Sequence, residues 1–527
     1  MEKIKWLEWS KEAFEKAKRE NKPVLLDIHG VWCHWCHQMN KSYSDGLVIE
    51  LVNEKFVPIK VDTDKRPDIN ERYNQGGWPT TAFLTPDGMI ITGATYLPPG
   101  QLAIMLEQVS NYFQRNKDTI QFDIQKPETA KTQVRSIMDS LADEMMLSFD
   151  TAHGGFGSHP KFPMPDLIEA AFLRFRQTND KSTLRIATKT LDGMTGILDS
   201  AEGGFFRYSV TREWDEPHYE KMLETNAQLI LNYIHAFRIT GEEKYRTIAE
   251  RTADFILNVL HGPEGFYGSQ DADRGEEYYG KPLEEREKMP TPFIDRNIYV
   301  SLNALAISAL LQLGGKYSNA ALETLENLWA MCFDPERGMC HYYDGKQNAF
   351  GLLLDNVSFS RCLLDAYEKT ANNNHIEMAQ QIIDFVIEKF YGDGFKDRIG
   401  EDNIGLLKAE NRNIHENSIA AACLTRLSFY TNDERYRKTA GDTLSIFANC
   451  MQYRLHAASY ALAAERFLDP IEITAKSREF SEEIPHDFRI MVKFDSSLSE
   501  NIVICFSNKC MKFKNMEEAK KQLLVVR

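Results

Sequence analysis

A repeated turn organises most of this 527-residue chain. A glycine followed by an apolar residue recurs five times, at Gly155-Phe156, Gly204-Phe205, Gly265-Phe266, Gly338-Met339 and Gly394-Phe395. Each spacing of 49 to 73 residues holds two segments with apolar residues at helical intervals, such as PDLIEAAFLRFRQ and SLNALAISALLQL. Two helices per interval indicate stacked hairpins, and a final hairpin through Phe467 brings the total to about six. The pattern predicts a closed (α/α)6 toroid over residues 119–470, in preference to an open solenoid.

Both ends of the chain lack this pattern. In residues 1–118 the strand-like runs PVLLDI, FVPIKVD, TTAFL and MIIT alternate with helical segments, which predicts one sheet covered by helices. After Asp469-Pro470 the strand-like runs IEITA, FRIMVKF and NIVICF precede the helical MEEAKKQLL. We therefore expect a multidomain protein, α/β plus all-α, in which residues 471–527 form a small α/β appendage to the toroid.

Composition and charge exclude several classes of function. The net charge is −15, from 62 basic and 77 acidic residues, and no basic run offsets it, so nucleic acid and anionic membranes are not expected partners. The first residues show no apolar signal region, and no stretch reaches the roughly 18 apolar residues of a membrane span. We expect a cytoplasmic protein. Nine cysteines, an odd number, argue against a disulfide framework and predict mostly reduced, buried thiols.

The strongest chemical signal is the cysteine pair in VWCHWCHQM. Cys33 and Cys36 can close a disulfide across the first turn of a helix, where free N–H groups and the helix dipole favour a thiolate on Cys33. Cys33 is the predicted nucleophile and Cys36 the resolving thiol. A partly protonated His34 between them would favour the thiolate further and make the disulfide readily reduced.

Three further features at compatible spacings resemble thioredoxins. Asp27, six residues before Cys33, matches the buried acid with which thioredoxins transfer a proton to the resolving cysteine. Trp32 directly precedes Cys33, and Pro79, 46 residues after it and just before a strand, matches the thioredoxin cis-proline. The resemblance implies a thioredoxin-like domain with the site residues Cys33, Cys36, His34, Asp27 and Pro79.

Three other interpretations of the dithiol stay open. Cys33, Cys36 and His37 match a c-type haem attachment motif, although that chemistry belongs to exported proteins. The same residues are candidate zinc ligands, but no fourth ligand stands at zinc-finger spacing. An inert core pair is the third alternative, and the polar histidines on either side argue against it. We expect no metal and no cofactor.

A second pair, Cys505 and Cys510, lies in VICFSNKCMKF near the end of the sequence. A turn between the two would bring them within bonding range, so a second redox pair is an alternative. Two unrelated thiols are the favoured interpretation.

Longer motifs resemble one family across most of the chain. The strings CHWCH, GGWPTTAFLTPDG, TYLPP, GGFGSHPKFP, GGFFRYSVTREWDEPHYEKML and DADRGEEYYG resemble those of the spermatogenesis-associated, thioredoxin-domain-containing proteins. The resemblance implies a thioredoxin-like domain joined to a body like that of six-hairpin glycosidases and N-acylglucosamine epimerases. It carries over a set of residues in loops expected to line the toroid mouth: His218, Glu220, Lys221, Asn226, Asp271 and Asp273. His415 and Glu416, in NRNIHENSIAA, are further candidates for a toroid pocket.

Two functions compete. The leading hypothesis is a thiol-disulfide oxidoreductase or redox-responsive protein that exchanges with a protein disulfide or dithiol. The alternative is a protein of carbohydrate metabolism that binds or processes a saccharide in the toroid. Hydrolysis would need two of the carboxyl groups of Glu220, Asp271, Asp273 and Glu416. Epimerisation would need a base such as His218 or His415. A scaffold with neither activity is the third hypothesis, and whether Cys33 faces solvent or the toroid bears most on the choice.

Overall fold

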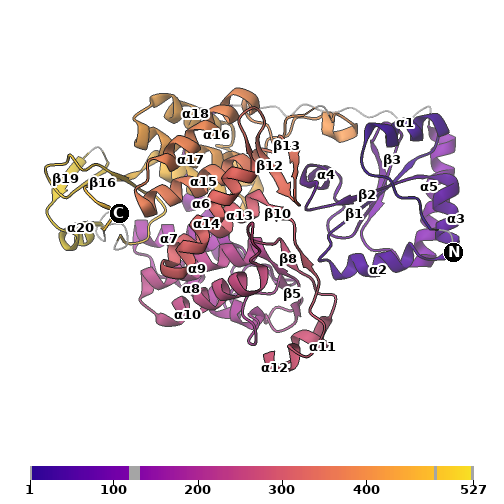
Figure 1. Cartoon of the computed structure of the whole chain (residues 1–527), viewed down its shortest axis with the longest axis horizontal. Helices are drawn as coiled ribbons and strands as arrows, with labels where there is room; N and C mark the ends of the chain where they lie inside the picture. The colour runs from indigo at the N-terminus through magenta and orange to yellow at the C-terminus, as the bar shows by residue number, and fades with distance from the viewer. Residues whose placement is uncertain (1–2, 118–130, 401, 480–483, 508, 524–527) are drawn as a thin grey trace.

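The computed structural model describes residues 3–117, 131–400, 402–479, 484–507 and 509–523. An N-terminal α/β part and a small C-terminal part lie on opposite sides of a helical body (Figure 1). The predicted fold class is confirmed. The predicted boundary between residues 118 and 119 lies outside the described residues, whereas the last helix of the body ends at Leu468 and the next strand begins at Ile471. No described helix has the length and apolar character needed to cross a bilayer.

The N-terminal part has one four-stranded sheet in the order β2-β1-β3-β4, with β1 parallel to β2 and the other neighbours antiparallel. Its elements are α1 (Lys11–Glu20), β1 (Val24–His29), α2 (His34–Ser42), α3 (Gly46–Lys55), β2 (Val57–Asp62), α4 (Pro67–Tyr73), β3 (Thr80–Leu84), β4 (Ile90–Ala94) and α5 (Pro99–Asn116). Phe14 of α1 and Tyr73 of α4 pack on one face of the sheet, and Met39 of α2 and Leu106 of α5 pack on the other. This helix-covered sheet is a thioredoxin-like arrangement.

Six inner helices of the body contact one another in a closed ring, in the order α7, α9, α13, α15, α17, α19 and back to α7. The inner helices are α7 (Pro165–Thr178), α9 (Leu223–Thr240), α13 (Val300–Leu313), α15 (Leu353–Thr370), α17 (Ile414–Thr431) and α19 (Ala458–Leu468). The outer helices are α6 (Met138–Ser148), α8 (Lys181–Met194), α10 (Glu243–Phe255), α14 (Gly315–Cys332), α16 (Asn374–Phe390) and α18 (Glu434–Ile446). Because α6 packs beside α19, the first and last helices of the body complete the sixth hairpin. The predicted (α/α)6 toroid is confirmed.

A buried asparagine holds four of the five repeated turns. Four inner helices carry one at their fourth position: Asn226, Asn303, Asn356 and Asn417. In each case Oδ1 accepts the backbone N–H that follows the turn glycine, at 2.6 to 2.9 Å. Each Nδ2 also donates to a backbone carbonyl one turn earlier on its own helix. Asn226, which the resemblance carried over as a site residue, therefore fastens a turn to a helix.

Short strands cross the toroid mouth, at the N-terminal ends of the inner helices, on the side that faces the thioredoxin-like part (Figure 1). The sequence pattern predicted loops here. The strands are β5 (Tyr208–Ser209), β6 (Pro217–His218), β7 (Lys221–Met222), β8 (Ser269–Gln270), β9 (Ile294–Asp295), β10 (Ile298–Tyr299), β11 (Phe333–Asp334), β12 (Gly338–Tyr343), β13 (Gln347–Phe350), β14 (Tyr391–Gly392) and β15 (Gly394–Phe395). Two short helices, α11 (Gly275–Tyr279) and α12 (Leu283–Arg286), accompany them.

The C-terminal part covers the other end of the toroid (Figure 1). Its sheet has the order β17-β16-β18-β19, and its elements are β16 (Ile471–Ala475), β17 (Ile490–Phe494), β18 (Ile502–Phe506), β19 (Lys509–Phe513) and α20 (Met516–Leu523). Cys505 and Cys510 lie directly opposite each other on β18 and β19 and form a disulfide. The favoured prediction of two unrelated thiols was wrong, because the hairpin register places them as a cross-strand pair. The other seven cysteines are free and buried, as predicted.

Candidate functional site

The dithiol lies at the start of α2 and faces the toroid. Cys33 is the N-cap of this helix, and the backbone N–H of Cys36 donates to Cys33 Sγ at 3.3 Å. Both cysteines are only 3% exposed. Trp32 and Trp78 pack around them from the same domain, and Met222 packs against them from the toroid. The dithiol is therefore enclosed at the interface between the two parts of the chain.

Asp27 and Pro79 complete the thioredoxin-like surroundings of the pair. Asp27 is buried in β1, with Oδ2 3.2 Å from Lys60 Nζ, and the Tyr43 hydroxyl donates to Oδ1 at 3.3 Å. Burial, the bond with Cys33 and the charge of Asp27 raise the pKa of the Cys36 thiol. The Trp78–Pro79 peptide bond is cis.

His34 does not have the environment that the sequence predicted. Its backbone N–H donates to Glu220 Oε1 at 3.5 Å, which links the first residue of α2 to the toroid. Burial is the main influence on the imidazole and lowers the pKa of His34 below its ordinary value. A lowered pKa leaves less of the ring protonated, which runs against the predicted contribution of a partly protonated His34 to the Cys33 thiolate.

His37 makes the closest contact between α2 and the toroid. His37 Nε2 lies 2.8 Å from Asp271 Oδ2, and Asp271 is 2% exposed. The bond with Asp271 raises the pKa of His37, while burial raises the pKa of Asp271. Asp271 Oδ1 has no hydrogen-bond partner among the described residues, so His37 is the side-chain contact that compensates its burial.

Charged side chains contact Trp32, the residue that precedes Cys33. The Arg207 guanidinium lies 4.4 Å from the centre of the Trp32 ring, and Trp32 Nε1 donates to Asp64 Oδ2 at 2.6 Å. Burial raises the pKa of Asp64 to about 8. His341 Nε2, from β12, lies 2.6 Å from the Asp64 carbonyl oxygen. The sequence did not predict Arg207, Asp64 or His341. One signal was available for Arg207, which directly follows the Gly-Phe-Phe turn.

A second contact region holds the thioredoxin-like part on the toroid. Arg72 of α4 forms a two-pronged bond with Asp397, at 2.7 and 3.1 Å, and Arg66 binds Asp402 at 2.9 Å. Leu407, which belongs to the toroid part of the sequence, packs inside the core of the thioredoxin-like part. A buried ion pair, Arg72–Asp397, and a shared core residue hold the two parts together more firmly than a linker alone would.

The seven predicted toroid residues do not line one pocket. Three of them surround the start of α2, namely His218, Glu220 and Asp271. His218 Nδ1 lies 3.4 Å from Glu220 Oε1, the oxygen that accepts the His34 N–H. The neighbour of Asp271 in the same turn, Asp273, accepts the backbone N–H of Phe293 at 3.3 Å. Docking of α2 onto these mouth segments brings His218, Glu220 and Asp271 to the start of α2, beside the dithiol.

Lys221 serves the fold. Its Nζ is fully buried and binds Asp199 at 2.6 Å and the Gly203 carbonyl at 2.9 Å. The preceding hairpin repeats this arrangement, with Lys161 bound to Asp150 and to the Gly154 carbonyl, both at 2.6 Å. The two sites start at the related strings DTAHGGF and DSAEGGF. Lys221 is therefore part of an internal repeat.

The central bore of the toroid is a cavity of about 780 Å³. All six inner helices line it, and residues 484–488, Ile490 and Val492 line its end beneath the C-terminal part. His415 faces the bore near the mouth, 3.6 Å from Asp166, together with Glu224. Burial raises the pKa of Glu224 and raises the pKa of Glu416 well above its ordinary range. Glu416 does not line the bore, although it follows His415 in α17.

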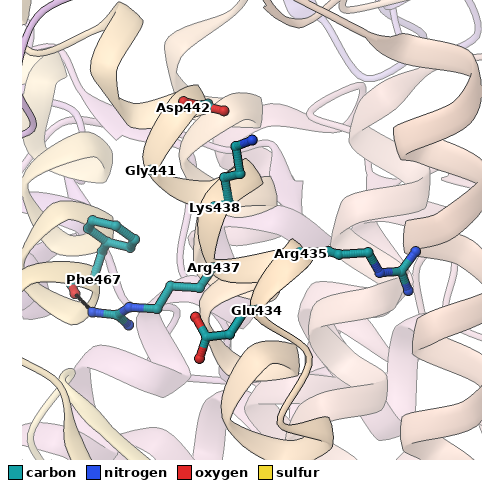
Figure 2. A pocket seen from close by; sticks show the side chains of 7 residues that line it. All are labelled: Glu434, Arg435, Arg437, Lys438, Gly441, Asp442 and Phe467. Carbon is teal, nitrogen blue, oxygen red and sulfur yellow. Dashed lines mark hydrogen bonds between the residues drawn. The ribbon is translucent and has the colours of Figure 1, made fainter.

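A second hollow, of about 540 Å³, lies on the outer surface where α18 meets the end of α19 (Figure 2). Arg437 donates to the Phe467 carbonyl at 3.0 Å, and its guanidinium carbon lies 4.8 Å from the centre of the Phe467 ring. This contact joins two helices, and the hollow has no link to the dithiol or the bore.

The donor atoms of Cys33, Cys36 and His37 do not gather as the zinc alternative requires, since His37 is turned to Asp271. Within the part of the chain that the structure describes, Glu169, His235 and His486 are the group whose donor atoms converge.

Fold and site together define a class of protein: a thioredoxin-like domain whose dithiol is held against the mouth of an (α/α)6 toroid. The comparisons support the thioredoxin-like domain and a relationship to one family over part of the chain. Residues 1–131 match the domain family Thioredox_DsbH, described as "Protein of unknown function, DUF255". Over 317 residues the chain is a homologue of spermatogenesis-associated protein 20 of Rattus norvegicus, at 35% identity over 53% of this chain and 40% of the relative. The predicted family resemblance is confirmed over this stretch.

A second relative and a solved structure extend the comparison. The uncharacterized protein B0495.5 of Caenorhabditis elegans is 35% identical over 303 residues, 51% of this chain and 41% of that protein. The match thus spans about 40% of the length of these curated relatives. A crystal structure of D-mannose isomerase aligns with a TM-score of 0.48 at 14% identity, over 59% of this chain and 86% of that one.

Proposed function

We propose that this protein is a redox-responsive thiol-disulfide protein whose Cys33–Cys36 dithiol works at the interface with the toroid. The observation that carries the proposal is the position of the pair at the start of α2 in a thioredoxin-like domain, with the Cys36 N–H aimed at Cys33 Sγ. Because both thiols are buried, a protein disulfide reaches them only after the two parts of the chain separate. The proposal therefore favours a redox-responsive role over that of a general reductant.

The chemistry proceeds in two exchange steps. The Cys33 thiolate attacks one sulfur of a partner disulfide, and the other sulfur leaves as a thiol. The Cys36 thiol passes its proton to Asp27 and attacks Cys33 Sγ, which releases the second thiol. The dithiol is oxidised by two electrons, and the partner disulfide is reduced to two thiols. The same steps run in reverse when a partner dithiol reduces the bond.

Glutathione tests the proposal without knowledge of the natural partner. The full chain with Cys505→Ser and Cys510→Ser is equilibrated in glutathione buffers of graded potential, quenched by alkylation and analysed by mass spectrometry. We expect a Cys33–Cys36 disulfide with a defined midpoint. A Cys36→Ser chain should carry one glutathione on Cys33, and a Cys33→Ser chain should carry none on Cys36. Two thiols that stay reduced in oxidised glutathione would leave an inert core pair.

We also propose a saccharide as the occupant of the bore. The cavity volume of about 780 Å³ lies within the range of small-molecule sites, and Glu224 and His415 supply an acid and a base beside it. Cellobiose should raise the thermal unfolding midpoint, the rise should persist in a Cys33→Ser chain, and Glu224→Gln should reduce it. The absence of a shift with a panel of mono- and disaccharides would count against this second proposal.

We propose a reducing cytoplasmic compartment. Seven free, buried cysteines support this assignment. Fractionation of the cells that express the protein, probed with a specific antibody, tests it, and recovery in an oxidising compartment would refute it.

A further inference from the structure

Two histidines and a glutamate converge at the closed end of the bore. Glu169 comes from α7, His235 from α9 and His486 from the segment between β16 and β17. Their nitrogen and oxygen donor atoms all lie within 4.8 Å of one another. Three segments that are far apart in the sequence, one of them from the C-terminal part, thus place ligand-type atoms at one point.

The distances within the cluster are short. Glu169 Oε1 lies 2.7 Å from His235 Nδ1, and Glu169 Oε2 lies 3.0 Å from His486 Nε2. The two imidazole rings stack, with centroids 3.5 Å apart and planes inclined by 13°. The side chains of Glu169, His235 and His486 are only 10 to 12% exposed. Both rings therefore turn a nitrogen towards the same buried carboxylate.

A neighbouring amide supplies an independent observation. Asn232 is 1% exposed, and its Nδ2 donates to Glu169 Oε1 at 2.9 Å and to the Pro165 carbonyl at 3.2 Å. These two acceptors fix the orientation of the amide. Asn232 Oδ1 then has no hydrogen-bond partner among the described residues. A buried, unpaired carbonyl oxygen is costly, and a water molecule bound to a metal ion would satisfy it.

The cations near the cluster are bound elsewhere. Arg238 donates to the side chain and backbone of Gln312 at 2.6 and 3.0 Å, and Arg466 donates to the Phe488 carbonyl at 2.8 Å. Among the described residues, the hydrogen-bond partners of Glu169 are Asn232, His235 and His486, and neither guanidinium is one of them. The negative charge of the cluster is thus available to a cationic ligand.

We propose that Glu169, His235 and His486 bind a first-row divalent metal ion at the closed end of the bore. Imidazole nitrogen and carboxylate oxygen are the ligands that Zn²⁺ and its first-row neighbours prefer. Three protein ligands leave coordination positions open, and all three residues line the bore, so these positions face the cavity. The metal ties the C-terminal part to the toroid and presents a Lewis acid to a molecule in the bore. This site departs from the sequence expectation of no metal.

The test uses the full chain with Cys33→Ser and Cys36→Ser, which removes the dithiol as a competing zinc ligand; the other five free cysteines are buried. The protein is stripped with a chelator and then titrated with Zn²⁺ in equilibrium dialysis, with metal content measured by elemental analysis. We expect one equivalent of bound Zn²⁺ per chain. His235→Ala and His486→Ala should each weaken binding at least 100-fold, and Glu169→Gln, which keeps the shape and hydrogen bonds of the side chain, at least 10-fold.

His261→Ala, at an exposed histidine outside the cluster, is the matched control and should leave binding unchanged. Circular dichroism of each variant verifies its fold. For variants that unfold, Co²⁺ replaces Zn²⁺ in the parent chain, and its visible spectrum must show nitrogen and oxygen ligands. A chain that binds no stoichiometric metal, or that binds it equally well in the Glu169→Gln, His235→Ala and His486→Ala variants, contains a hydrogen-bonded triad instead, and the proposal fails.

Discussion

Loss of the His37–Asp271 contact should open the dithiol to solvent. Asp271→Ala removes the carboxylate 2.8 Å from His37 Nε2 but keeps the backbone carbonyl that accepts the Tyr279 hydroxyl. A hydrogen bond to a charged group contributes about 1.5 to 3 kcal/mol. Burial raises the pKa of Asp271, which shows that the carboxylate is itself costly to enclose, so we take the lower value. A change of about 1.4 kcal/mol is tenfold in an equilibrium constant, and the open population should rise about tenfold.

The rate of alkylation of Cys33 measures this population. When the interface recloses faster than the reagent reacts, the rate is proportional to the fraction of open molecules. Iodoacetamide labelling of the reduced full chain, followed by peptide mass spectrometry, should therefore give about a tenfold faster reaction in Asp271→Ala. Asp273→Ala is the matched control, because Asp273 lies in the same turn and accepts only the Phe293 N–H in addition to its contact with Arg274. An unchanged rate in Asp271→Ala, or a parent rate equal to that of urea-unfolded chain, would refute the enclosed dithiol.

Three further predictions concern stability, each measured by urea unfolding of the full chain. Since burial raises the pKa of Asp64 to about 8, its protonated form stabilises the fold below the unfolded pKa of about 4, and this stabilisation is lost as the pH rises through about 8. Asp64→Asn still accepts the Trp32 N–H and should therefore raise the free energy of unfolding at pH 9 by about 1 to 3 kcal/mol, with little effect at pH 5. Equal effects at both pH values would contradict the raised pKa of Asp64. Asn303→Ala should lower the free energy of unfolding by about 2 to 4 kcal/mol, because it leaves the buried Phe266 N–H and carbonyl unpaired. A loss below about 0.5 kcal/mol would show that the bonds between Asn303 and the turn are dispensable. Leu407→Ala should lower the free energy of unfolding by about 2 to 4 kcal/mol, because this toroid residue fills the core of the thioredoxin-like part. It should also speed the alkylation of Cys33, and destabilisation without faster labelling would mean that Leu407 does not hold the interface.

The toroid was predictable because its cause is local. A glycine turn, two amphipathic helices and a return to the next glycine define one hairpin, and the pattern repeats in the sequence. The asparagine at the fourth position of the next inner helix is equally regular, at Asn226, Asn303, Asn356 and Asn417, but its role depends on a contact 17 to 37 residues back. The periodicity predicts the helices, and only the tertiary structure shows that these asparagines bind the preceding turns.

The environment of the dithiol was predictable only in part. The spacing of Asp27, Trp32, Cys33 and Cys36 follows from one strand and one helix start, so sequence was sufficient to place them. The state of His34 was not, because burial in the folded chain lowers the pKa of the imidazole. Glu220 and Asp271, which were assigned to a toroid pocket, turn towards α2, 186 and 234 residues earlier in the sequence.

The sequence by itself determined a thioredoxin-like dithiol, Cys33 and Cys36, and a ring of helical hairpins, because both depend on short-range spacing and periodicity. The tertiary structure alone decided that the dithiol is enclosed against Met222 and that His37 pairs with Asp271. It also decided that Glu169, His235 and His486 meet at the end of the bore. These contacts join segments from different parts of the chain, and ring closure and domain docking, which no local pattern records, bring them together.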